Sequence, residues 1–223
     1  MALPPIDSGY ATRLRHGYRS GRDTIGRSDG NVRAQSWGRA IINRGRMVLG
    51  LVGLMWVIEV IDTVVLGRSL NAIGIHPRDV GRAWQIPLAP FLHGDFGHLI
   101  SNTGPLLWLG AMVSVWGVGE FLLVTAGITV FGGAGTWLIG RDAVHQGGSL
   151  LALGFFGYLV ARGAVERRVI AVALAILTVY WYGYAAWSVL PAVPRVSWES
   201  HLSGMLAGAA MGYLRARVTR TRA

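Results

Sequence analysis

The stretch VIAVALAILTVYW at Val169–Trp181 decides the fold class of this chain, because it contains no charged residue. A second uncharged stretch, MVLGLVGLMWV, covers Met47–Val57. A helix needs about 20 mostly apolar residues to cross the hydrocarbon core of a bilayer. Several apolar segments of this kind follow one another between Met47 and Leu214. The sequence therefore predicts an all-α integral membrane protein.

The overall composition agrees with a membrane domain. The 223 residues are 52% hydrophobic and only 14% charged, whereas soluble domains carry about 25% charged residues. The chain contains no cysteine and no lysine, which excludes disulfides, thiolate nucleophiles, cysteine-type zinc sites and a Ser/Lys dyad. Its net charge of +10 comes from arginines that gather before Met47 and after Leu214. Arginines that flank apolar helices indicate membrane topology, so we expect no nucleic-acid partner.

Three regions follow from this pattern. Residues 1–46 are polar and basic, lack the apolar core of a signal peptide, and are predicted to form a disordered cytoplasmic tail. Residues 47–214 are predicted to form one six-helix membrane domain, and residues 215–223 a second basic cytoplasmic tail. The predicted spans are about 47–66, 96–116, 120–139, 149–162, 169–190 and 198–213.

The predicted membrane domain has two unusual polar features. Residues 67–95 are too polar to span and form a long first outer loop. Glu59 and Asp62 lie three residues apart on one face of the first predicted span. Intramembrane carboxylates normally face the bundle or water, but the sequence leaves the role of these two open.

The arginines also predict the orientation. With the N-terminus inside, sixteen of the 21 arginines fall on the inner side, so the positive-inside rule places both termini in the cytoplasm. Six polar residues then fall near the outer ends of helices, at one membrane depth. They are His93, His98, Asn102, His145, Ser149 and His201. This predicts a polar site a little below the outer surface.

Ser149 follows Gly147 and Gly148 and begins a predicted helix. A helix N-terminus offers free N–H groups and a partial positive charge, both of which stabilise an oxyanion. Taken alone, this tripeptide fits a simple N-cap serine equally well.

His201 begins the last predicted helix and adjoins a face of small residues. Such faces let membrane helices pack closely, and the helix of Ser149 offers matching small residues. The small residues concerned are Gly204, Gly208 and Gly212 on one helix and Ala152, Gly157 and Ala161 on the other. Close packing would bring Ser149 Oγ to the His201 ring as nucleophile and general base. Ordinary helix packing with an interfacial histidine remains the alternative.

His98 and Asn102 lie one helical turn apart and share a face. Both can donate hydrogen bonds to an oxyanion, although polar contacts between membrane helices would also explain them.

Three motifs in order resemble the rhomboid family of intramembrane serine proteases. FLHGDFGHLISN (91–102) resembles the His-x4-His-x3-Asn motif of the second helix, HQGGSLLALGFFGYLVARG (145–163) the GxSG helix, and SWESHLSGMLAG (197–208) the final helix. WVIEVIDTVVLGRSLNAIGIHPRD (56–79) is similar to actinobacterial members. The resemblance covers about residues 47–213.

The resemblance implies the roles of the site residues. Ser149 would attack a peptide carbonyl and His201 would take its proton. His98, Asn102 and the Ser149 N–H would bind the oxyanion, while His93, Gly147 and Gly148 would support the site. It implies no cofactor and no metal. The expected partners are single-pass transmembrane substrates, cut near the outer face, and the lipids of a bacterial plasma membrane.

Two positions depart from the family pattern. Leu150 stands where the family has a glycine after the nucleophile, and Leu153 where it has an aromatic residue. These departures leave open a rhomboid-like pseudoprotease that binds transmembrane segments without cutting them. A metal-dependent protein using His93, His98, His145 and His201 is a further alternative, although no HExxH motif is present.

Overall fold

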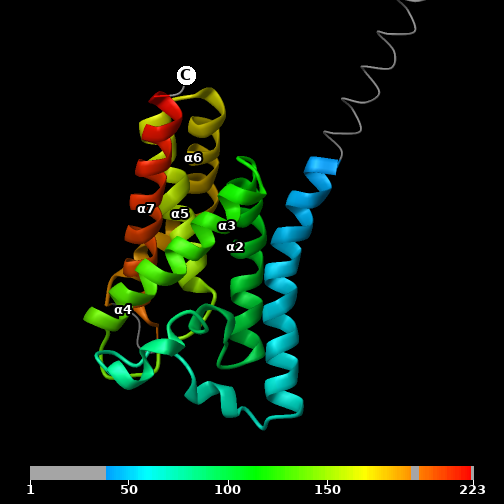
Figure 1. Ribbon diagram of the computed structural model, residues 1–223, viewed down its shortest axis with the longest axis vertical. Coiled ribbons are helices and arrows are strands. Elements are labelled where there is room, and N and C mark those ends of the chain that lie inside the picture. The colour runs from blue at the N-terminus through cyan, green and yellow to red at the C-terminus, as the bar shows by residue number, and fades with distance from the viewer. Residues whose placement is uncertain (1–38, 192–195, 222–223) are drawn as a thin grey trace, which may run out of the picture. The chain divides into compact units, whose positions relative to one another are not determined.

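The computed structural model describes residues 39–191 and 196–221, and in these ranges it contains helices but no strand (Figure 1). The chain divides into two units, Met1–Asn43 and Arg44–Ala223. Nearly all of the predicted N-terminal tail lies outside the described residues. The description below concerns the second unit.

Six long helical segments cover the described part of the chain. They are Arg39–Val64; α2 (Phe96–Ser114); α3 (Val118–Gly127), continued by the π-helical η4 (Ile128–Gly132) and by α4 (Gly133–Ile139); α5 (Ser149–Glu166); α6 (Val169–Tyr182), continued by η5 (Gly183–Val189); and α7 (Trp198–Thr221).

Four of these segments are long and apolar enough to cross a membrane: Arg39–Val64, Val118–Ile139, Ser149–Glu166 and Val169–Val189. Two of the four expose many large apolar side chains, among them Val64 and Tyr180, each 76% exposed. By contrast, α5 is mostly buried and forms the centre of the bundle. These segments indicate an integral membrane protein.

Two helices are longer than their predicted spans. The chain is already helical at Arg39, so the last residues of the predicted N-terminal tail belong to the first helix. At the other end, α7 continues to Thr221 through most of the predicted C-terminal tail. The continuation is stabilised because Ala216 is buried and Arg215 pairs with Glu120 at the start of α3.

The centre of the fold is the contact between α5 and α7. A Cβ atom on Gly208 would overlap the carbonyl oxygen of Gly154 and lie 2.6 Å from its carbonyl carbon. Gly204 packs in the same way on the backbone of Leu150, and Gly212 on that of Tyr158. Glycines thus let the two backbones touch, and the predicted small-residue packing of these helices is confirmed.

The end of the bundle at which α2 and α5 begin, here called the loop end, is covered by the segment after the first helix (Figure 1). This segment contains three short 3-10 helices, η1 (Ser69–Ala72), η2 (Val80–Gln85) and η3 (Ala89–Phe91). Asp62, buried at the end of the first helix, accepts a hydrogen bond from the Leu70 N–H at 2.9 Å. Asp62 therefore holds the beginning of the covering segment, which gives this one of the two carboxylates a structural role. The other, Glu59, is also buried and accepts a hydrogen bond from Thr63.

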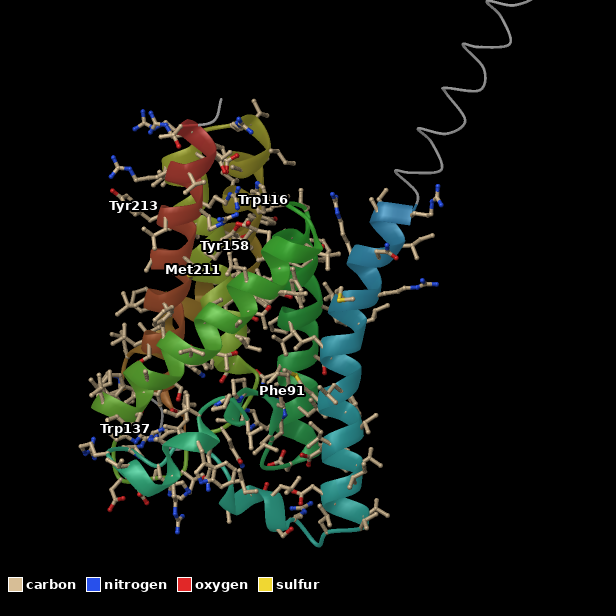
Figure 2. The ribbon with its side chains drawn as sticks, viewed as in Figure 1. Phe91, Trp116, Trp137, Tyr158, Met211 and Tyr213 are labelled. Carbon is tan, nitrogen blue, oxygen red and sulfur yellow. The ribbon has the colours of Figure 1, made fainter. Side chains whose placement is uncertain are left out.

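The opposite end, here called the charged end, holds a buried ionic cluster. Arg162 of α5 lies 2.6 Å from both Glu120 and Glu166, and Glu120 also binds Arg215 of α7 at 2.6 Å. Tyr158 donates to Glu120, and the Arg162 guanidinium stacks over the Trp116 ring. Figure 2 shows Trp116 and Tyr158 beside each other at this end, and Phe91 and Trp137 at the loop end. The cluster joins α3, α5 and α7.

Candidate active site

Ser149 is the first residue of α5, at the loop end of the bundle. Its position depends on Gly147, which has a φ of +123°. Residues with a side chain rarely adopt this backbone conformation. A Cβ at this position would also lie 2.5 Å from the His98 ring. The Gly147 N–H donates to the Ala89 carbonyl at 2.9 Å. The turn before Ser149 therefore requires glycine, as predicted, and rests on both α2 and the covering segment.

His93 supports the next residue of this turn. Its buried ring accepts a hydrogen bond from the Gly148 N–H through Nε2, at 3.1 Å, and lies edge-on to the His98 ring. Burial, and next the proximity of His98, lowers the pKa of His93 to about 4. His93 is therefore neutral at ordinary pH and keeps the lone pair that Gly148 needs.

Asn102 contributes an unpaired donor. Its side chain is buried between α2 and α5, and nothing in residues 39–191 or 196–221 hydrogen-bonds its Nδ2. A buried polar group without a partner is uncommon and needs an explanation. Asn102 lines the same cavities as Ser149, so its amide is available to a group bound there.

Two cavities meet at Ser149. A mostly apolar one of about 260 Å³ extends between α2, α5 and the α6–η5 segment, and a more polar one of about 480 Å³ lies under the loops. Four residues line both cavities, namely Ser101, Asn102, Ser149 and His201. His98 lines only the polar cavity. The structure thus brings the predicted nucleophile, base and oxyanion donors to one place.

His201 faces these cavities from the first turn of α7. Its Nδ1 atom lies 2.8 Å from Ser188 Oγ and 3.2 Å from the Ser188 carbonyl oxygen. No hydrogen bond joins Ser149 to His201 among those of the described residues, although both side chains border the same space. Ser188 carries no motif in the sequence, and our sequence interpretation missed it.

Glu199 plays a different part from a triad carboxylate. It is buried and accepts a hydrogen bond from the Arg141 N–H at 3.2 Å. Glu199 therefore holds the loop before α5, and it makes no hydrogen bond to His201 among the described residues.

His145 also has a structural role. Its Nδ1 bonds Ser197 Oγ at 2.6 Å, its Nε2 bonds the Arg141 carbonyl at 3.0 Å, and its backbone pairs with Ile75. Both ring nitrogens are engaged. Across the described ranges, no group of three histidine, aspartate or glutamate side chains is arranged to hold a metal ion.

The two departures from the family pattern are accommodated differently. Leu150 is 3% exposed and lines neither cavity. Its side chain points to η4, where a Cβ on Gly132 would lie 3.4 Å from Leu150 Cδ1. Leu153 lines the apolar cavity together with His201. Leu150 therefore occupies core space and leaves the space in front of Ser149 open.

Comparison with known proteins agrees with the motifs. A family model described as the Rhomboid domain matches residues 80–218. An uncharacterised protein of Mycobacterium tuberculosis is 34% identical over 179 residues, which cover 76% of this chain and 74% of that protein. An uncharacterised protein of Mycobacterium leprae is 34% identical over 179 residues, covering 76% of this chain and 70% of that protein. A Bacillus subtilis protein with the provisional name rhomboid protease YdcA is 35% identical over 79 residues, or 34% of this chain and 40% of its own.

Proposed function

This chain belongs to the rhomboid family, and we propose that it is an intramembrane serine protease with Ser149 as nucleophile and His201 as general base. One observation carries the proposal. Ser149, His201 and the unpaired amide of Asn102 border the space where a polar cavity meets an apolar one. Hydrolysis inside a membrane needs such a junction, because water and an apolar substrate segment must reach the same atom.

The proposed reaction has two halves. Ser149 Oγ attacks the peptide carbonyl carbon while its proton passes to His201 Nε2. The oxyanion accepts hydrogen bonds from Asn102 Nδ2, His98 and the Ser149 N–H at the start of α5. His201 then donates the proton to the leaving amine, and the C–N bond breaks. In the second half, a water from the polar cavity loses its proton to His201 and attacks the acyl ester. His201 then returns this proton to Ser149 Oγ as the ester C–O bond breaks and the carboxyl product leaves.

The proposed substrates are single-pass transmembrane proteins. An unfolded part of the substrate helix would enter from the membrane, with an apolar side chain in the cavity that Leu153 and Phe156 of α5 line. We further propose that all six helical segments cross a bacterial plasma membrane and that both termini lie in the cytoplasm. The loop end, with its long covering segment, then faces outward, and cleavage occurs near the outer surface.

The decisive test is cleavage of a model transmembrane substrate in proteoliposomes. Wild type should cut it, whereas Ser149→Ala and His201→Ala should be inactive but folded. Since the two residues act as one unit, the double variant should match either single variant. Substantial cleavage by purified Ser149→Ala would exclude the mechanism. A wild type that binds the substrate without cutting it would instead indicate a pseudoprotease.

The orientation has a separate test. In intact cells, a tag inserted near Arg78 or Asp142 should be accessible to external protease, and a C-terminal tag should be protected. The reverse pattern would place the site at the cytoplasmic surface and contradict the proposed topology.

A further inference from the structure

The imidazole of His201 contacts a serine of the neighbouring helical segment. Ser188 lies near the end of η5, thirteen residues before His201 in the sequence, and offers two oxygen atoms to the same ring nitrogen. Its hydroxyl lies 2.8 Å and its carbonyl 3.2 Å from His201 Nδ1. Both side chains line the apolar cavity beside Ser149.

The direction of these hydrogen bonds follows from the available protons. The Ser188 hydroxyl donates its only proton to the Ala185 carbonyl, at 2.6 Å. While it makes this bond, its oxygen can only accept a hydrogen bond from His201. The Ser188 carbonyl can also only accept. The hydrogen atom shared at this contact must then belong to His201 Nδ1, which leaves Nε2 of the neutral ring unprotonated.

We propose that Ser188 is the positioning residue of His201, fixing the Nδ1–H tautomer and the ring orientation that a general base at Nε2 requires. The inference rests on the proposed function. It assigns to a neutral serine the work that a buried carboxylate performs in a Ser-His-Asp triad, where the third residue holds the imidazole in its correct tautomer. Because Nδ1–H remains bonded when Nε2 takes a proton, the same two oxygens also stabilise the imidazolium.

No other described side chain competes for this part. Within residues 39–191 and 196–221, both hydrogen bonds of His201 Nδ1 go to Ser188, and the nearby Glu199 is held by Arg141. The carbonyl of Ser188 persists in any variant, so replacement of the side chain removes one of two acceptors. We therefore expect a partial loss of activity rather than inactivation.

The test compares three variants with wild type in the proteoliposome assay. Ser188→Ala removes the hydroxyl acceptor, and Ser188→Thr keeps it. Ser114→Ala is the matched control, since Ser114 also donates to a carbonyl three residues earlier, Ala111 at 2.7 Å, but has no hydrogen bond to a histidine among the described residues. Loss of one hydrogen bond predicts that Ser188→Ala lowers kcat by about 3- to 10-fold. KM should stay unchanged because the serine acts on the base. Ser188→Thr and Ser114→Ala should keep the wild-type kcat.

A second readout is independent of activity. In ¹⁵N spectra of the histidine-labelled protein, with His201 assigned by His201→Gln, wild-type Nδ1 should appear as the protonated nitrogen. Its resonance should shift in Ser188→Ala and not in Ser114→Ala. A protonated Nε2 in wild type, or an unchanged kcat in Ser188→Ala, would overturn the inference. If wild type proves unable to cleave, the proposed function fails and the spectra alone decide: an unshifted Nδ1 in Ser188→Ala refutes the positioning role.

Discussion

The substitution Gly208→Ala tests the architecture on which the site depends. The added Cβ would overlap the carbonyl oxygen of Gly154 and lie 2.6 Å from its carbonyl carbon. Non-bonded carbon atoms normally approach to about 3.5–4.0 Å, so α7 must move away from α5 by roughly 1 Å. The obstacle is backbone at the centre of the bundle, and no side-chain rotation can relieve it.

We expect the change to cost about 1–3 kcal/mol of stability, the usual range for overpacking, and towards the upper end of it. A Cβ on Gly204 would lie 3.1 Å from the nearest carbonyl carbon of α5, so Gly204→Ala should be milder. Activity should fall as well, because α5 carries Ser149 and α7 carries His201, and the separation changes their spacing.

Thermal unfolding in detergent, together with the cleavage assay, measures both effects. Gly104→Ala is the matched control, since Gly104 is an exposed helical glycine of α2 with no atom within 4 Å of its ideal Cβ position. If Gly208→Ala melts and cleaves like Gly104→Ala, the close approach of α5 and α7 is wrong.

Three further predictions concern the charged end, the His93 turn and the residue after the nucleophile. Arg162→Ala leaves two glutamates buried without their shared partner and should cost about 3–5 kcal/mol in thermal unfolding, whereas the exposed Arg217→Ala should change stability by no more than about 0.5 kcal/mol; equal melting would refute the cluster's role. The pKa of His93 falls from its ordinary 6.5 to about 4 on folding, so the unfolded chain takes up this proton first and stability should decline as pH falls through that window. In His93→Gln, stability should depend less on pH in this window, because the contribution of this one proton is absent. Identical pH profiles of stability for the variant and wild type would contradict the prediction. Leu150→Gly removes a buried side chain and should lower stability by about 2–5 kcal/mol without raising kcat; a large gain in kcat would indicate that wild-type Leu150 obstructs the site.

Most helix beginnings are predictable from the sequence, although the first helix begins at Arg39, well before its predicted start at Met47. The predicted starts at Phe96, Ser149, Val169 and Trp198 coincide with those of α2, α5, α6 and α7. Turn residues, glycines and charges precede these positions, and such signals act locally along the chain. The starts could therefore be derived from neighbouring residues alone.

The predicted ends of α5 and α7 fall short because the sequence interpretation equates charge with exposure. It ends the fourth span at Arg162, yet Arg162 is 3% exposed and α5 continues to Glu166. The spacing of Arg162 and Glu166, four residues apart, was visible in the sequence and is compatible with pairing on one helix face. Their third partner, Glu120, is 42 residues from Arg162, and no local pattern links it to them. A buried charge is predictable only together with its partners.

In the candidate site, too, some residues are predictable from local sequence and one is not. Ser149, His201, His98, Asn102 and His93 occur in motifs, and the structure gathers them around one space. Ser188, within the run YAAWSVL, has no motif. Its contact with His201 exists because the 3-10 segment η5 brings position 188 over the first turn of α7. That placement depends on how two helices end and begin, which residue spacing does not specify.

Leu150 illustrates why a departure from a motif cannot be judged at one position. A larger residue after the nucleophile obstructs catalysis only if its side chain enters the space that the substrate needs. Here the side chain points into the core, where the glycine at position 132 leaves room beside it. Gly132 ends the π-helical turn η4, and such turns often occur at functional sites. The effect of leucine at position 150 is therefore decided by a residue on another helix, which the motif around Ser149 does not include.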